Sequence, residues 1–66
     1  MDIKKNFTYH KPKDIQISSY EEIRDMAMRM AVVVETDCPV SRERSIALTK
    51  LEECVMWANA AVARHK

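Results

Sequence analysis

Four arginines and one tyrosine are the side chains of this sequence best suited to binding a phosphorylated ligand. Arg24 and Arg29 carry planar guanidinium groups, which donate paired hydrogen bonds to phosphate. Arg42 and Arg44 fall in the first turn of a predicted helix, where free backbone N–H groups and the helix dipole attract an anion. Tyr9 offers a ring on which a nucleobase can stack. Together these residues indicate a site for a small nucleotide.

A plainer interpretation is that the arginines pair with nearby carboxylates on solvated helix faces. The acids at suitable positions are Glu21, Asp25, Glu43 and Glu52. Spacing alone leaves both interpretations open. A formal net charge of +1 argues against a nucleic-acid polymer as the ligand. The local basic clusters, in the N-terminal segment and at the start of the last helix, favour a small anion.

No pattern typical of catalysis or of a bound metal is present, so we predict neither an enzyme nor a cofactor. The chain has no glycine, which excludes a glycine-rich phosphate loop. Glu52 and Glu53 are adjacent on a helix, so their carboxylates diverge. His10 and His65 are far apart, and no cysteine lies near either of them at metal-ligand spacing.

Residues 41–65 form the longest periodic run and predict a helix around which the rest of the chain is organised. The run lacks glycine and proline, and Ser41 is a candidate N-cap. Its apolar residues recur at steps of three and four, the period of one helix face. That stripe consists of Ala47, Leu48, Leu51, Cys54, Val55, Ala58, Ala61 and Val62. Met56 and Trp57 lie off the stripe, so more than one face of this helix must be covered.

Residues 18–36 predict a second helix. Ser18 and Ser19 precede Glu21 and Glu22 at the spacing of a capping box, which marks a helix start. Its apolar stripe consists of Ile23, Met26, Ala27, Met30, Ala31 and Val34. We interpret the methionines as core filler in preference to a promiscuous binding surface.

Residues 1–17 predict an N-terminal arm. Pro12 disfavours helix around it, and Ile15 and Ile17 alternate with polar residues as in a short extended piece. We expect the arm to dock on the helices, although a frayed tail is the alternative. Pro39 ends the first helix, and the connection to Ser41 is short, so the two helices should be antiparallel neighbours.

A single domain of 66 residues is too short to cover two helices that are apolar on several faces. We therefore predict an all-α helical hairpin with a docked N-terminal arm, assembled as a compact homo-oligomer. The N-terminus lacks the features of a signal peptide, and no run is long enough to span a membrane, so we expect a cytosolic protein. In a reducing cytosol, Cys54 should be a buried free thiol and Cys38 an exposed one in the turn.

The pattern from Arg44 to Arg64, RSIALTKLEECVMWANAAVAR, resembles the C-terminal helix of a family of phage anti-CBASS cyclic-oligonucleotide sponges. The resemblance extends without gaps through IRDMAMRMAVVVE, residues 23–35, and on to Tyr9. It implies a helical homo-hexamer that sequesters cyclic di- or trinucleotide immune messengers in the host bacterial cytoplasm, without cleaving them. Such sponges keep the messengers from their CBASS effectors. Family members hold these two ligand types in separate pockets between protomers.

The resemblance also assigns roles to individual residues. Tyr9 matches the aromatic residue of the dinucleotide pocket, and Arg24 stands where the family has a phosphate-binding lysine. Arg42 falls near the arginine of the trinucleotide pocket, and Thr49 matches a family threonine. The segment between the helices is shorter than in longer relatives, so we expect one pocket type to be reshaped or removed. Two alternatives stay open: a sponge for cyclic ADP-ribose-type signals, and a structural or protein-binding helical oligomer.

Overall fold

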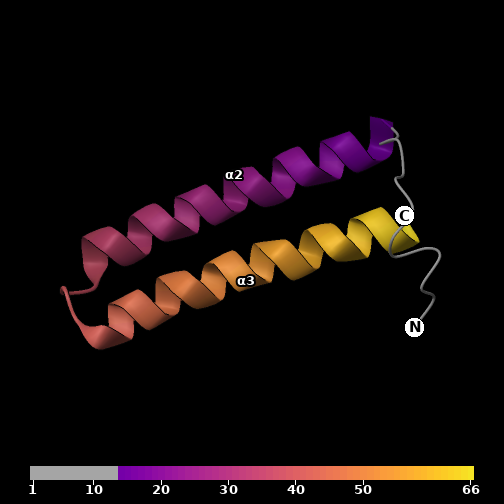
Figure 1. The fold of residues 1–66 in the computed structure, drawn as a ribbon. Coiled ribbons are helices and arrows are strands. Elements are labelled where there is room, and N and C mark those ends of the chain that lie inside the picture. The colour runs from indigo at the N-terminus through magenta and orange to yellow at the C-terminus, as the bar shows by residue number, and fades with distance from the viewer. Residues whose placement is uncertain (1–13) are drawn as a thin grey trace.

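The computed structural model describes residues 14–66 and contains two helices in that range. Helix α2 spans Asp14–Asp37 and helix α3 spans Arg42–His65, each of 24 residues. Figure 1 shows them lying side by side and antiparallel, joined at one end by residues 38–41. No strand occurs among the described residues. The predicted all-α hairpin is therefore confirmed for this part of the chain, while the docking of the N-terminal arm through residue 13 lies outside it.

The predicted start of the first helix is wrong by four residues. Helix α2 begins at Asp14, so Ile15 and Ile17 are helical and not extended. The Ser19 hydroxyl donates a 3.0 Å hydrogen bond to the Ile15 carbonyl one turn earlier, as a serine inside a helix does. The capping box at Ser18 or Ser19 is therefore not formed. Asp14 instead places a carboxylate in the first turn, where the helix dipole favours it.

Helix α3 starts where the sequence predicted, directly after the N-cap candidate Ser41. Ser41 has extended backbone angles, φ −168° and ψ 167°, and its hydroxyl accepts the Arg44 N–H at 3.1 Å. This is the geometry of a serine N-cap. At the other end, the Lys66 N–H donates to the Val62 carbonyl at 3.1 Å, and Arg64 and His65 place basic side chains in the last turn. The predicted long helix is thus correct at its N-terminal end.

The hairpin buries very little of its apolar surface. Val34 is the one hydrophobic residue among residues 14–66 that is buried, at 8% exposure. The contact between the helices is otherwise made by half-buried residues: Ile23, Ala27 and Ala31 on α2, and Leu48, Leu51, Val55, Ala58 and Val62 on α3. Met26, Met30 and Cys54 belonged to the predicted core stripes but are exposed. One neighbouring helix covers only part of each stripe.

The Gln16 side chain links the N-terminal end of α2 to the C-terminal end of α3, at the open end of the hairpin. It is the one buried polar residue in the described range, at 5% exposure. Its side-chain amide donates to the Val62 and Lys66 carbonyls, both at 3.2 Å. The Val62 carbonyl also accepts the Lys66 N–H, whereas the Lys66 carbonyl lies beyond the last turn of α3, where helical partners are lacking. A residue near the start of α2 therefore supplies a hydrogen-bond donor to the end of α3.

Candidate functional site

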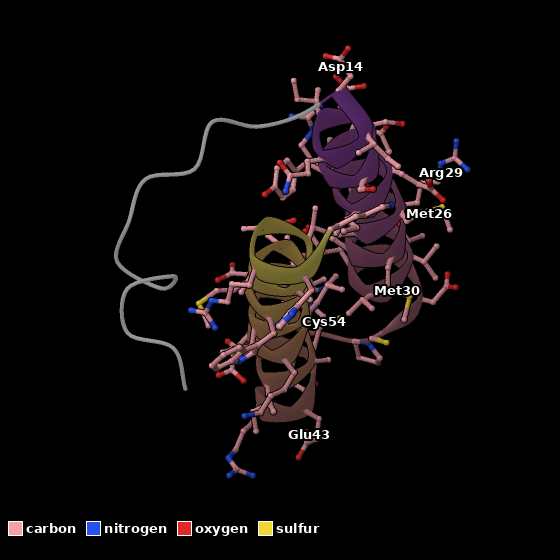
Figure 2. The ribbon with its side chains drawn as sticks, turned by 90° about the vertical axis from the view of Figure 1, so that its right-hand side faces the viewer. Asp14, Met26, Arg29, Met30, Glu43 and Cys54 are labelled. Carbon is pink, nitrogen blue, oxygen red and sulfur yellow. The ribbon has the colours of Figure 1, made fainter. Side chains whose placement is uncertain are left out.

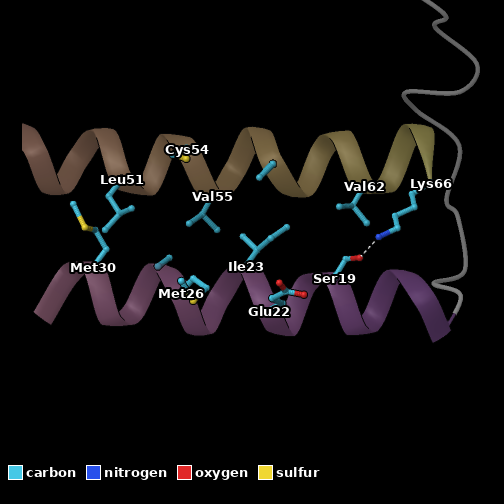
Figure 3. Close-up of a pocket in the computed structure, with 12 residues that line it drawn as sticks. Ser19, Glu22, Ile23, Met26, Met30, Leu51, Cys54, Val55, Val62 and Lys66 are labelled. Atoms are coloured by element: carbon cyan, nitrogen blue, oxygen red, sulfur yellow. Dashed lines mark hydrogen bonds between the residues drawn. The ribbon is translucent and has the colours of Figure 1, made fainter. Parts of the chain in front are cut away.

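A broad apolar groove runs along one side of the hairpin, between the two helices. It has a volume of about 530 Å³. Figure 3 shows its central lining, with side chains converging from both helices: Ile23, Met26, Met30, Leu51, Cys54 and Val55. We call this surface the Met26–Cys54 groove. Its polar end is formed by Ser19, Glu22 and Lys66, where the Lys66 ammonium donates to the Ser19 hydroxyl at 2.6 Å.

A smaller groove, of about 300 Å³, is lined by a different set of residues from the same two helices. Apolar atoms of Met28, Ala31 and Val55 form its floor, and Arg24 and Glu52 contribute charges from opposite helices. We call it the Arg24 groove. The Arg24 guanidinium and the Glu52 carboxylate do not form an ion pair, because the one salt bridge among residues 14–66 joins Lys50 and Glu53 at 3.4 Å.

The candidate arginines are not engaged by carboxylates. Arg24, Arg29 and Arg42 are all exposed, and none takes part in a salt bridge within the described part of the chain. The plainer interpretation, in which acids on neighbouring turns neutralise them, is therefore not the arrangement found here. These three guanidinium groups are available to an external anion.

Arg44 differs from Arg24, Arg29 and Arg42 because its side chain forms hydrogen bonds across the loop between the helices. Its guanidinium donates to the Glu35 carbonyl at 3.3 Å and to the Cys38 carbonyl at 3.4 Å. Both acceptors lie at the C-terminal end of α2, where carbonyls lack helical partners. The Ser41 hydroxyl completes this end of the hairpin by donating to the Pro39 carbonyl at 2.9 Å. Arg44 thus has a structural position in the single chain.

The other predicted site residues lie apart from one another. Arg42 and Thr49 are exposed on α3 and share a face, because seven residues make nearly two full turns and advance about 10 Å. Arg24 belongs to the other helix, and Figure 2 shows Arg29 projecting outward on the side of α2 that carries Met26 and Met30. Tyr9 lies outside the described residues. One hairpin therefore does not gather Arg24, Arg29 and Arg42 into a single pocket.

The sequence interpretation missed the exposure of Cys54 and the role of Gln16. Both cysteines are free and exposed, so the expected burial of Cys54 within its own chain is wrong. The cause is the width of the apolar stripe: Cys54 stands at its edge, beyond the reach of α2. The side-chain carbonyl oxygen of Asn59 is also buried and lacks a hydrogen-bond partner among residues 14–66. The sequence pattern gave no signal for either polar residue, since each depends on its tertiary neighbours.

Residues 14–66 contain no group of three or more His, Cys, Asp or Glu side chains arranged to hold a metal ion. Neither described helix combines the length and apolar content that crossing a bilayer requires.

The described residues define a helical-hairpin protein in which Arg24, Arg29 and Arg42 have no carboxylate partner among residues 14–66. A model of the Acb2/Tad1 hairpin domain matches residues 1–63. The chain therefore belongs to the Acb2/Tad1 family, the phage anti-CBASS sponges that sequester cyclic nucleotides and are not enzymes. Comparisons with curated proteins and with solved structures gave no significant match.

Proposed function

We propose that this protein is a homo-oligomeric sponge, a hexamer, that binds cyclic di- or trinucleotides in the host bacterial cytoplasm. It holds these messengers without cleaving them and so prevents them from activating CBASS effectors. The family match supports the function. The structural observation that carries it is the set of exposed arginines with no carboxylate partner in residues 14–66. A ring of phosphates is the kind of anion that such free donors bind.

The distribution of the candidate residues supports two ligand pockets, each completed by other copies of the chain. In the first, Tyr9 stacks on a base of a cyclic dinucleotide and Arg24 binds its phosphate. In the second, Arg42 and Thr49, on one face of α3, bind a cyclic trinucleotide. Because each hairpin presents Arg24, Arg42 and Thr49 on open surfaces, a neighbouring copy must supply the opposite wall. Repetition by symmetry gives several sites per assembly without a large net charge.

Arg29 and Arg44 have a weaker case as ligand residues than Arg24 and Arg42. The Arg44 guanidinium already donates to the Glu35 carbonyl of α2 and to the Cys38 carbonyl of the loop. Arg29 lies on the outer surface of α2, beside Met26, and away from the Arg24 groove. Both stay in the proposed set as residues that adjust loop position or assembly around the pockets.

Calorimetry with a panel of cyclic di- and trinucleotides tests the proposal. Arg24→Ala and Tyr9→Ala should weaken dinucleotide binding, and Arg42→Ala should selectively weaken trinucleotide binding, each by about 1–3 kcal/mol. Lys50→Ala is the matched control, because Lys50 is an exposed cation already paired with Glu53. Ligand recovered intact after the protein is denatured would distinguish a sponge from an enzyme.

Other outcomes point to the two remaining functions. Binding of cyclic ADP-ribose derivatives, with no response to cyclic oligonucleotides, would indicate a sponge for a different signal. An oligomer whose melting temperature responds to none of these nucleotides would indicate a structural or protein-binding role, because a ligand that binds the native state raises that temperature.

A further inference from the structure

The Met26–Cys54 groove leaves a large apolar surface uncovered. Met26 and Met30, which line it, are 58% and 54% exposed, and Cys54, which lines it from α3, is also exposed. These side chains occupy one side of the hairpin (Figure 3). A contiguous exposed apolar patch of this kind is typical of an interaction surface. The glutamate and lysine that line the groove stand at one end and leave its centre without charge.

The dimensions of this side match those of an interface between two hairpins. Two 24-residue helices are about 36 Å long, and their shared face is about 20 Å wide, which gives about 700 Å². Stable interfaces bury about 800 Å² on each partner. Two hairpins stacked through this side would form a four-helix bundle, in which each hairpin covers the exposed apolar side of the other.

Charges on α2 indicate how the second copy is oriented. Glu22 lies four residues before Met26 and Arg29 lies three residues after it. Their seven-residue spacing places both on the same edge of the helix. Neither forms a salt bridge among residues 14–66. A two-fold axis crossing α2 at Met26 therefore sets Glu22 opposite Arg29 of the partner subunit, and Arg29 opposite Glu22 of the partner subunit. Such reciprocal contacts define an isologous interface.

We propose that the Met26–Cys54 groove is the interface with a second copy of this chain, packed with the two α2 helices antiparallel and Met26 near the two-fold axis. The inference deepens the proposed assembly of copies, but it does not depend on nucleotide binding. It names the face that is covered and the pair of charges that fixes the register.

The two cysteines provide an internal test of which face is covered. Both are exposed in the hairpin, but Cys54 lines the groove whereas Cys38 lies in the loop. Each thiol's rate of alkylation by N-ethylmaleimide should be measured by mass spectrometry, relative to its rate in the urea-unfolded chain. In the oligomer, Cys54 should react at least tenfold more slowly than Cys38, and dilution into the monomer range should abolish the difference. Equal relative rates in a protein shown by light scattering to be oligomeric would overturn the proposal.

Charge exchange tests the register. Glu22→Arg and Arg29→Glu should each weaken dimerisation about tenfold, because each creates a repulsive pair on both sides of the axis. The double variant Glu22→Arg/Arg29→Glu restores opposite charges and should recover most of the affinity. Glu21→Arg is the matched control, an equal change at an exposed neighbour about 100° away around the helix.

A double variant that associates no better than either single variant would contradict the antiparallel arrangement. The readout is the dissociation constant from analytical ultracentrifugation, measured without any nucleotide. Calorimetry on the same samples separates the two proposals, because an unaltered parent that assembles but binds no cyclic nucleotide disproves the sponge function alone.

Discussion

At the scale of single residues, Gln16 is the side chain whose loss should most disturb the hairpin. Its amide donates to the Val62 and Lys66 carbonyls while the residue is almost fully buried. Gln16→Ala should lower the free energy of unfolding by about 1–3 kcal/mol, the combined effect of losing two hydrogen bonds of roughly 0.5–1.5 kcal/mol each. Urea denaturation followed by circular dichroism measures the change.

Gln16→Glu is the sharper companion variant. It preserves the length of the side chain but replaces the N–H₂ donor with a carboxylate, beside the negative end of the α3 dipole. At neutral pH it should destabilise the chain at least as much as alanine does. If Gln16→Glu had the stability of the parent protein, the contact with the end of α3 would contribute no stability.

The contrast between Arg44 and Arg42 also belongs to this scale. Both were predicted as anion ligands because they fall in the first turn of a helix. The structure separates them: Arg42 is exposed, whereas Arg44 is half-buried and donates to carbonyls across the loop. Sequence position gave the turn but not the direction of the side chain, which depends on where α2 ends.

At the scale of the helices, Ser41 is expected to control the start of α3. Its hydroxyl accepts the Arg44 N–H, so Ser41→Ala should lower the free energy of unfolding by about 1 kcal/mol, the usual effect of removing an N-cap. Ser41→Asp restores an acceptor and should recover that stability. Ser45→Ala is the control, since Ser45 is exposed one turn into the same helix. Equal stabilities of Ser41→Ala and Ser45→Ala would show that the cap contributes little.

The helices also show which features local sequence can predict. The loop around Pro39 and the cap at Ser41 were predictable because each depends on residues within a few positions. The start of α2 was not, because serine–glutamate spacing at Ser18 and Ser19 mimics a cap. Asp14 and the long-range contact of Gln16 with α3 override that local signal. Exposure of Cys54 and Met26 was equally unpredictable, because it depends on how much of a stripe one partner helix covers.

At the scale of the whole molecule, the large apolar side chains that residues 14–66 leave exposed are what the proposed assembly of copies would cover. Trp57, the single tryptophan, is 64% exposed in the hairpin, and Met56 beside it is 57% exposed. Neither lines the Met26–Cys54 groove. A higher oligomer such as a hexamer needs more than one interface, and these residues lie on a second surface available for it.

Trp57 provides the test of that second surface. Its fluorescence emission should shift to shorter wavelength as protein concentration rises, and the melting temperature should rise with it. Trp57→Ala should weaken assembly, by about 3 kcal/mol if the ring becomes fully buried, while leaving the helix content of the dilute protein unchanged. Constant emission over a range in which light scattering detects association would exclude Trp57 from the interface.

The short loop of residues 38–41 has a consequence for timing. Chains that close a short loop between neighbouring helices have low contact order and fold in microseconds to milliseconds. Ribosomes add about 5–20 residues per second, so each chain would complete its hairpin almost as soon as α3 has left the ribosome. Association of copies is then the slow step, and its rate rises with the square or a higher power of concentration. Under the proposed function, the capacity to capture a messenger would appear abruptly once synthesis passes a threshold.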